Sequence, residues 1–264
     1  MEMIAFGLSD AGRVRSVNED ALLLDEKSGL FAVADGMGGH NCGEVASRMA
    51  VGILQDNINR AAGHVAIFGD IDQSFSYQAN LLASAIRLAN RAIYEAAGSN
   101  SAWHGMGTTV AAVLVNNNKV GIAHVGDSRV YLLRQGSLRQ ITVDHSLVAE
   151  QLRKGLISSE EAITSKQKNI ITRALGHEAT VEVDLYDLEI LGGDRLLICS
   201  DGLTGMVTDQ EIAALIQSRS EPQLACRDLV EQSNARGGLD NITALLLYFD
   251  KKNGIVARLK KMLK

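Results

Sequence analysis

Hydrophobic positions along the chain follow two periods, which occur in separate blocks. Apolar residues recur at helical spacing in Cys42–Arg60 and in about Gln78–Ala97, which predicts two amphipathic helices. Shorter helices are predicted over Asp209–Ser218 and Pro222–Asn234, the latter with proline at its first position. Short apolar runs bounded by turn residues predict strands over Ile4–Leu8, Ala21–Leu24, Leu30–Ala34, Thr109–Val115, Lys119–Val125, Val130–Arg134, Leu138–Val143, Val181–Ile190, Arg195–Ser200 and Ile242–Phe249.

The order of these elements indicates the fold class. Strands come first, then two long helices, four strands in close succession, a more polar segment, further strands, two helices and a last strand. The short connections between the four central strands favour antiparallel pairing. The polar segment Asp144–Gly176 is predicted to be mostly helical, with a helix start at Ser158. Because strands and helices are grouped rather than alternating, we expect an α+β fold in which helices cover antiparallel sheets.

Composition narrows the class of protein. The 264 residues are 46% hydrophobic and 22% charged, as in ordinary globular proteins, and the net charge of −5 argues against broad nucleic-acid binding. No apolar stretch reaches the roughly 20 residues that span a bilayer, and the N-terminus lacks the basic segment of a secretory signal. Three cysteines without a CxxC pair are typical of a reducing compartment, so we expect a cytoplasmic protein.

Four aspartates lie at the mouths of apolar runs, each next to or near glycine. Asp35, Asp127 and Asp201 end predicted strands, and Asp240 opens one. If these strand ends meet, the carboxylates must raise one another's pKa or be neutralised by a cation. Oxygen donors select Mg²⁺, Mn²⁺ or Ca²⁺, and no EF-hand loop is present. A single aspartate beside glycine is more often a turn residue, so this metal-site hypothesis depends on their number and shared position.

Eight short motifs then occur in the order seen in a known family. They are Arg15–Asp20, Asp35–His40, Gly105–Thr109, Val125–Arg129, Asp144–Ser146, Thr172–Gly176, Ser200–Leu203 and Gly238–Thr243. Together they resemble the metal-dependent protein phosphatases of type 2C, the PPM family, and in particular its bacterial branch. The match extends from about residue 4 to residue 249. One such motif alone is weak, whereas eight in order are specific.

The resemblance implies a metal centre with two Mg²⁺ or Mn²⁺ ions. Asp35 would bridge the two metals, and the carbonyl of Gly36 would bind one of them. Asp201 and Asp240 would bind the other. Asn241, which follows a ligand directly, would orient it.

Four further residues receive roles from the same resemblance. Glu19 and Asp20 would hold metal-bound waters, and Asp127, with Asp201, would form the third metal site of bacterial members. Arg15 would grip the substrate phosphate, a task suited to its planar guanidinium.

The resemblance also implies a fold and a domain division. The fold is two packed antiparallel sheets flanked by helix pairs, and residues 1–250 would form the catalytic domain. The segment of about 145–176 would be a flap near the site. Many eukaryotic members have a histidine after the Asp-Gly pair, proposed as general acid, where this chain has Met37. His40 nearby is interpreted as a structural residue at the start of a helix.

Other polar residues in or near the motifs are interpreted as structural rather than catalytic. His124 is expected to be a satisfied core histidine, and His145 a turn or helix-start residue. Arg129 is expected to form a structural ion pair. Thr108 and Thr109 are expected to start a strand and stabilise the turn rather than act as nucleophiles.

The implied function is metal-dependent hydrolysis of phosphoserine and phosphothreonine in proteins. A water activated at the carboxylate site would attack phosphorus, and the enzyme would reverse a bacterial Ser/Thr kinase. Two alternatives stay open: a catalytically weak, metal-binding phosphoprotein adaptor, and a phosphatase of an anti-sigma-factor antagonist. Every expected metal carboxylate is present, which argues against the adaptor.

The C-terminal tail, Lys251–Lys264, differs from the rest of the chain. It has six basic residues and no acidic one, and its apolar residues fall on one helical face. This pattern is compatible with a helix that binds a membrane surface or a partner. The preferred interpretation is a frayed or core-docked tail, since so short a helix is marginal alone.

Overall fold

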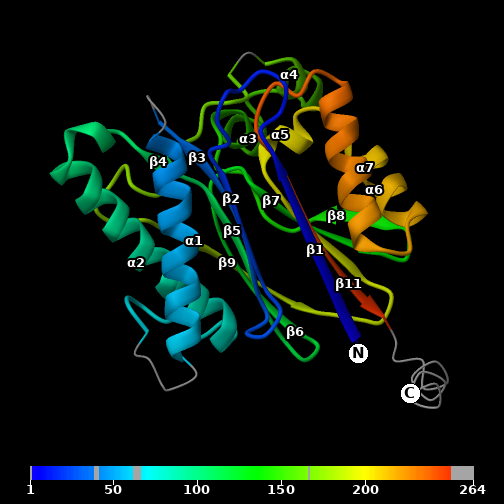
Figure 1. Ribbon diagram of the computed structural model, residues 1–264, viewed down its shortest axis with the longest axis horizontal. Coiled ribbons are helices and arrows are strands. Elements are labelled where there is room, and N and C mark those ends of the chain that lie inside the picture. The colour runs from blue at the N-terminus through cyan, green and yellow to red at the C-terminus, as the bar shows by residue number, and fades with distance from the viewer. Residues whose placement is uncertain (1, 39–41, 62–66, 166, 251–264) are drawn as a thin grey trace.

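Two antiparallel sheets pack face to face between two helix pairs, as the computed structural model shows (Figure 1). The structure describes residues 2–38, 42–61, 67–165 and 167–250. The predictions for His40 and for the tail 251–264 therefore lie outside the described residues. Within the described part of the chain, no helix is both long and apolar enough to cross a membrane.

The first sheet joins the two ends of the described chain. Its strand order is β1-β11-β10-β7-β8, and each neighbouring pair is antiparallel. Its strands are β1 (Glu2–Asp10), β7 (Arg129–Arg134), β8 (Ser137–Gln140), β10 (Arg195–Cys199) and β11 (Ile242–Asp250).

The second sheet contains the strands on either side of the long helices. Its order is β2-β3-β5-β6-β9, again antiparallel throughout, and the short strand β4 pairs with the end of β3. Its strands are β2 (Asp20–Asp25), β3 (Leu30–Met37), β4 (Gly107–Thr108), β5 (Val110–Asn116), β6 (Lys119–Val125) and β9 (Asp184–Glu189).

Helices cover the outer face of each sheet. On the second sheet lie α1 (Cys42–Ala61) and α2 (Tyr77–Ser99), and on the first lie α6 (Asp209–Ser218) and α7 (Pro222–Ala235). At the upper end of the sheets in Figure 1 are the short helices α3, α4 and α5. Their bounds are α3 (Leu147–Arg153), α4 (Ser159–Thr164) and α5 (Asp201–Thr204), and a 3-10 turn, η1, spans Ser101–Trp103.

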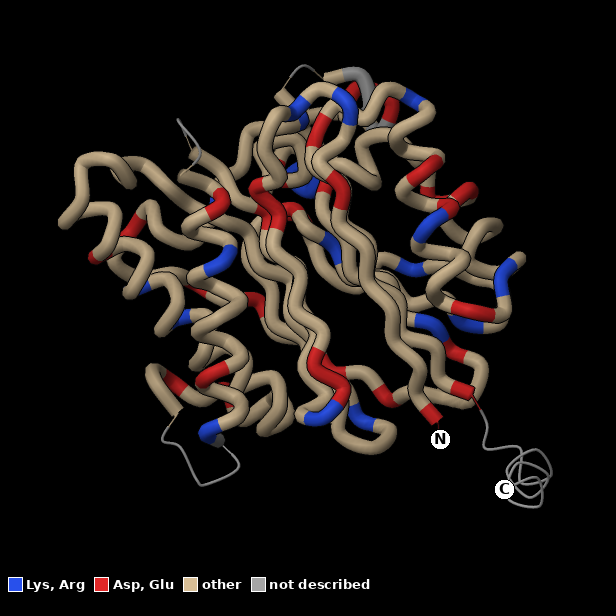
Figure 2. Tube along the Cα trace, in the orientation of Figure 1, with Lys and Arg blue, Asp and Glu red and all other residues tan. Residues whose placement is uncertain are grey.

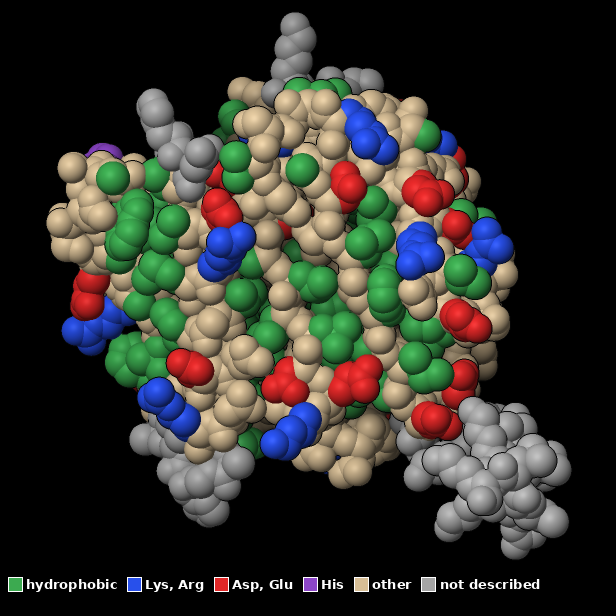
Figure 3. Space-filling view, viewed as in Figure 1, with side chains coloured by type: hydrophobic (Ala, Val, Ile, Leu, Met, Phe, Trp, Pro, Cys, Tyr) green, Lys and Arg blue, Asp and Glu red, His purple; other side chains and the backbone are tan. Residues whose placement is uncertain are grey.

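Both faces of the central strands are buried, which explains their nearly continuous apolar sequences. In β3, Leu30 and Ala32 face the helices, whereas Phe31 and Val33 face the other sheet. The edge strands are less covered: Figure 3 shows hydrophobic side chains on the face where β1 and β2 lie, and Ile4 of β1 is 44% exposed. The core is thus three apolar layers, one between the sheets and one under each helix pair.

The observed elements confirm the predicted α+β class and the two long helices to within two residues at each end. The prediction that Asp144–Gly176 is mostly helical is wrong. Among the described residues of this segment only α3 and α4 are helical, and the residues after α4 are held by distant partners: Leu175 bridges to Thr108, and Ile171 to Ser146. Pairing with distant residues produces no regular spacing of apolar residues in the local sequence, so the sequence pattern could not predict it.

Candidate active site

The sequence-predicted carboxylates lie together at one end of the two sheets. Asp20 is paired directly with Asp35 across β2 and β3, and Asp127 lies in the turn between β6 and β7. Asp201 is the first residue of α5, and Asp240 comes shortly before β11. Figure 2 shows Asp and Glu positions gathered at the upper ends of the central strands. The topology therefore brings segments more than 200 residues apart to one place.

Asp35 is the centre of this cluster. Its pKa lies well above the usual range because the carboxyl is buried and because Asp20, Asp201, Asp127 and Asp240 add negative charge around it. The same burial, with the charge of Asp240, raises the pKa of Asp201, whose carboxyl is hydrogen-bonded to that of Asp35. These mutual effects show that the five side chains share one electrostatic environment.

The backbone of Asp35 is fixed by two threonines. Its N–H donates to Thr109 Oγ1 at 3.0 Å, and its carbonyl accepts from the Thr109 N–H and the Thr108 hydroxyl, each at 2.9 Å. Thr108 belongs to β4, so this two-residue strand holds the end of β3 in place. The interpretation of Thr108 and Thr109 as structural residues rather than nucleophiles is consistent with these contacts.

Gly36 lies where α1 approaches β3 most closely. A Cβ atom on Gly36 would lie 2.1 Å from the carbonyl oxygen of Gly43 and 2.6 Å from that of Glu19. No side chain fits there without moving backbone. The absence of a side chain thus lets the start of α1 close over the end of β3.

Asp20 connects the two sheets. Its Oδ2 accepts hydrogen bonds from Ser200 Oγ at 2.8 Å and Thr243 Oγ1 at 2.6 Å, both on the first sheet's side. Its Oδ1 is buried and has no hydrogen-bond partner. Burial raises the pKa of Asp20 to about 7, although the two hydroxyl donors oppose this change. The unpartnered oxygen is a place where a cation or a cation-bound water fits.

Asp127, on the other side of the cluster, resembles Asp20 in its unpartnered oxygen and its raised pKa. Its Oδ1 is buried without a partner, and burial, together with the charges of Asp201 and Asp144, raises its pKa to about 8. Arg129 does not neutralise it, because this arginine binds Asp144 through Nε and Nη2 at 2.7–3.1 Å. The interpretation of Arg129 as a structural ion-pair residue is confirmed.

Arg15 lies at the rim of the cluster, half-exposed, and contacts a carboxylate of the cluster. Its Nη2 donates to Asp240 Oδ2 at 2.8 Å, and the two side chains are 51% and 35% exposed. This hydrogen bond is the main reason that the pKa of Arg15 is raised. The loop that carries Arg15 packs closely on the loop of Asp240: a Cβ on Gly12 would lie 2.2 Å from the Asp240 carbonyl oxygen.

Asn241 holds that loop from within. Its Oδ1 accepts from the Glu19 N–H at 2.8 Å, and its Nδ2 donates to the carbonyls of Ala11 and Val17 at 3.0 and 2.9 Å. All polar atoms of its amide are therefore used to position the segment from Ala11 to Glu19. Burial raises the pKa of the Glu19 carboxyl at the end of this segment. The positioning role expected for Asn241 thus has a geometric basis: its side chain holds the segment that ends at Glu19, and its backbone N–H donates to Asp240 Oδ1 at 2.8 Å.

Sequence reasoning missed the part of His145. Its N–H donates to the Gly126 carbonyl at 2.7 Å, its Nδ1 accepts from the Gly126 N–H at 3.0 Å, and its Nε2 lies 3.2 Å from Asp184. It therefore clamps the turn that carries Asp127. The signal was present in the Asp144–Ser146 motif, but only the fold shows that this motif reaches the turn after β6. His124, expected to be a satisfied core histidine, is fully buried, yet its ring nitrogens lack hydrogen-bond partners of normal geometry.

The donor set fits hard divalent cations. The cluster offers carboxylate oxygens and main-chain carbonyls, and two buried oxygens, one on Asp20 and one on Asp127, have no hydrogen-bond partner. Among the described residues, no group of three or more His, Cys, Asp or Glu side chains is already disposed to hold a metal ion. In this structure Asp35 and Asp201 contact each other, and Asp240 contacts Arg15.

Comparisons with known proteins identify the family of this chain. The family model described as Protein phosphatase 2C matches residues 7–242. A serine/threonine phosphatase, stp, of Listeria innocua is 41% identical over 242 residues, which is 90% of this chain and 93% of that protein. The crystal structure of the Mycobacterium tuberculosis serine/threonine phosphatase PstP/Ppp matches with a TM-score of 0.83 and 38% identity, covering 94% of this chain and 99% of that one.

A second solved structure bears on the metal. It is the catalytic domain of the serine/threonine protein phosphatase PstP in complex with two manganese ions, with a TM-score of 0.81 and 37% identity over 94% of this chain and 99% of that one. Together, the family model, the relatives and the fold give one answer. This chain belongs to the protein phosphatase 2C family of metal-dependent serine/threonine phosphatases.

Proposed function

We propose that the carboxylate cluster around Asp35 is the catalytic site of this phosphatase. The observation that carries the proposal is geometric: Asp20 is paired with Asp35 across β2 and β3, and Asp20 and Asp127 each have a buried carboxylate oxygen without a hydrogen-bond partner. Burial and the four neighbouring carboxylates also raise the pKa of Asp35. A protein keeps such repulsion only where something compensates it, and a bound divalent cation compensates it best. The family's Mg²⁺ or Mn²⁺ supplies that charge.

We assign the metal-holding residues as follows. Asp35 would contact both ions, the Gly36 carbonyl would bind one of them, and Asp201 and Asp240 would bind the other. Glu19 and Asp20 would hold metal-bound waters. Asp127 would complete a third position with Asp201. When bound, the metals supply an activated water and neutralise the phosphoryl oxygens. The unpartnered oxygens of Asp20 and Asp127 support this assignment.

Arg15 would bind the substrate phosphate. It is the cation at the rim of the cluster, and half of its side chain is exposed. Its hydrogen bond to Asp240 aims the guanidinium at the site and leaves its other N–H groups for phosphoryl oxygens. Asn241 would act through the loop that it holds, as a positioning residue.

The substrates are phosphoproteins, and we propose that they include the targets of a bacterial Ser/Thr kinase or the kinase itself. We propose a cytoplasmic location, which the buried free thiols of Cys199 and Cys226 support. Residues 1–250 would form the catalytic domain, with about 145–176 as its flap and 251–264 as a separate tail.

The test is phosphate release from a phosphothreonine peptide in Mn²⁺, in EDTA and by the Asp201→Ala variant. Asp56→Ala, at an exposed position on α1, is the matched control. We expect release that needs metal, disappears in Asp201→Ala and persists in the control. Wild-type turnover by a folded Asp201→Ala protein would refute the site. No release by any folded, metal-bound protein would favour an adaptor. If the enzyme is active, capture of phosphoproteins by Asp201→Ala would identify a kinase or an anti-sigma-factor antagonist as partner.

A further inference from the structure

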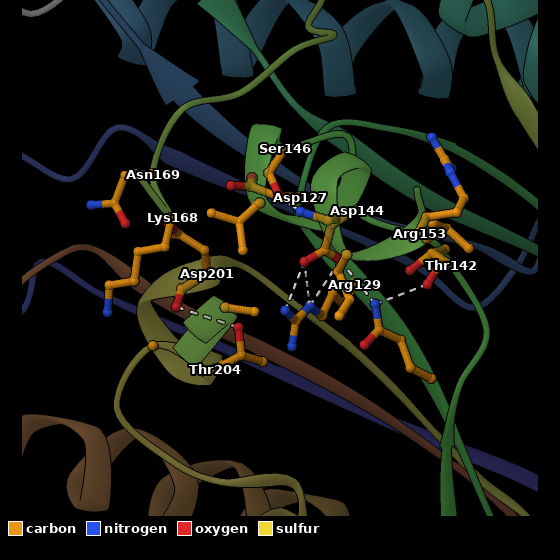
Figure 4. A pocket seen from close by; sticks show the side chains of 17 residues that line it. Asp127, Arg129, Thr142, Asp144, Ser146, Arg153, Lys168, Asn169, Asp201 and Thr204 are labelled. Atoms are coloured by element: carbon orange, nitrogen blue, oxygen red, sulfur yellow. Dashed lines mark hydrogen bonds and ion pairs between the residues drawn. The ribbon is translucent and has the colours of Figure 1, made fainter. Parts of the chain in front are cut away.

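A pocket of about 790 Å³ opens directly beside the carboxylate cluster. Asp127 and Asp201 are part of its lining, together with residues of α3, of the segment after α4, of the segment between β8 and α3, and of α5 (Figure 4). A phosphorylated residue bound at the cluster would therefore have its flanking chain next to this pocket. The question is which side chains of a substrate the pocket favours.

The charges that line the pocket do not all remain available to a substrate. Arg129 donates to Asp144 through Nε and Nη2, so the charges of these two side chains neutralise each other. Asp127 and Asp201 belong to the metal centre under the proposed function, on which this inference rests. Two cations are left, Arg153 at the end of α3 and Lys168 after α4.

Both cations are exposed and available. Within the described parts of the chain, neither Arg153 nor Lys168 forms an ion pair, since Glu150 on α3 pairs with Lys154 instead. In Figure 4 they lie on opposite sides of the Arg129–Asp144 pair. An acidic side chain that enters the pocket would therefore meet a positive charge on one side or the other.

The pocket also has an apolar wall suited to a peptide. Val143 and Leu152, both in its lining, are 42% and 40% exposed, and Val148 and Ala149 lie beside them. Apolar walls lower the local dielectric constant and so strengthen the attraction between an entering carboxylate and the two cations. A solvated surface without such a wall would discriminate charge far less.

We propose that this pocket is a substrate subsite that selects acidic side chains next to the phosphorylated residue, with Arg153 and Lys168 as the specificity-determining residues. The overall charge of the chain is −5, so an acidic substrate is favoured here only by this local arrangement. The selection acts on substrate binding and not on the metal centre.

The test uses three phosphothreonine peptides that differ only in having Glu, Gln or Lys on both sides of the phosphothreonine. With Mn²⁺ and wild-type enzyme, we expect KM to be about three- to tenfold lower for the Glu peptide than for the Lys peptide, with similar kcat. The double variant Arg153→Glu and Lys168→Glu should reverse the order. Its turnover of p-nitrophenyl phosphate, which has no flanking residues, should be unchanged.

Lys119→Glu is the charge control, because Lys119 is exposed at the opposite end of β6 from Asp127. It should leave the peptide order as in the wild type. Equal KM values for the Glu and Lys peptides with wild-type enzyme, or an unchanged order in the double variant, would overturn the subsite. If no phosphate is released from any substrate, the proposed function fails first. Binding of the three peptides, followed by fluorescence anisotropy, then still decides whether the pocket prefers acidic chains.

Discussion

Replacing Asp20 by asparagine should stabilise the metal-free protein at pH 8, although it removes a residue of the proposed metal centre. Asp20 is buried, one oxygen accepts hydrogen bonds from Ser200 and Thr243, and the other has no partner. Burial raises its pKa to about 7. The ionised carboxylate is therefore a cost to the folded protein whenever no cation is bound.

The sign and size of this stabilisation follow from the difference between the pKa of Asp20 in the folded protein and in the unfolded chain. The folded pKa is about 7 and the ordinary value is 3.8, so the folded protein holds the proton more tightly than the unfolded chain. The stability contribution of Asp20 is therefore lost as the pH rises from about 4 to about 7, and the loss is complete above that. A difference of about 3 pH units corresponds to about 4 kcal/mol.

Asparagine removes this loss but adds a smaller one. Its carbonyl can still accept from Ser200 and Thr243, while its NH₂ group would replace the unpartnered oxygen and bury an unsatisfied donor, at a cost of about 1–3 kcal/mol. The expected net gain at pH 8 is about 1–3 kcal/mol, falling to near zero at pH 5.

The assay is urea unfolding in EDTA at pH 5 and pH 8, followed by circular dichroism, with Asp56→Asn as the surface control. Added Mn²⁺ should reverse the order, because the wild type then gains more stability from metal binding than the variant. If wild type and Asp20→Asn show the same change in stability between pH 5 and pH 8, Asp20 does not titrate in this range and the reasoning is refuted.

Three further substitutions test other parts of the site. Arg15→Ala should raise KM for a phosphopeptide about tenfold or more, and an unchanged KM would count against phosphate binding by this arginine. Asn241→Ala should lower kcat by about 10–100-fold because the loop of Glu19 loses the amide that holds it. The free energy of unfolding should fall by only a few kcal/mol. Full activity in spite of a loosened loop would contradict this role. Gly36→Ala should lower both stability and Mn²⁺ affinity in calorimetry, since its Cβ would lie 2.1 Å from the Gly43 carbonyl, and a crystal structure with unmoved backbone would disprove the clash.

The long helices and central strands could be predicted from the sequence because their buried apolar residues recur at regular spacing. The helix predicted over Cys42–Arg60 is observed as Cys42–Ala61, and strands such as Lys119–Val125 match exactly in their bounds. These segments bury one stripe or both faces, so their apolar spacing reflects their geometry. The described residues of the segment 145–176 are mostly not buried, and its second half is held by contacts such as Arg173 with Asp184, which no local pattern encodes.

The site itself was predictable only in part, for a topological reason. A sequence can indicate that an aspartate lies at the end of a strand, but not which strand ends share an edge. Here β11 lies between β1 and β10 in one sheet, and β3 lies between β2 and β5 in the other, and this order brings Asp240 and Asp201 to Asp20 and Asp35. The resemblance to the family's motifs predicted which aspartates lie together. Strand periodicity alone could not, because it does not say which strand ends are neighbours.

Asp20 shows how closely the fold and the site depend on each other. Its carboxylate on the second sheet is held by Ser200 and Thr243 on the first, so the sheets must pack in register before the cluster exists. Packing then buries the carboxylate and raises its pKa, which costs stability. A bound cation removes this cost, so the free energy that the protein loses by burying the carboxylates reappears as affinity for the metal. The metal-free protein should therefore be least stable under the neutral to alkaline conditions in which it binds metal best, and this is what the Asp20→Asn comparison in EDTA and in Mn²⁺ measures.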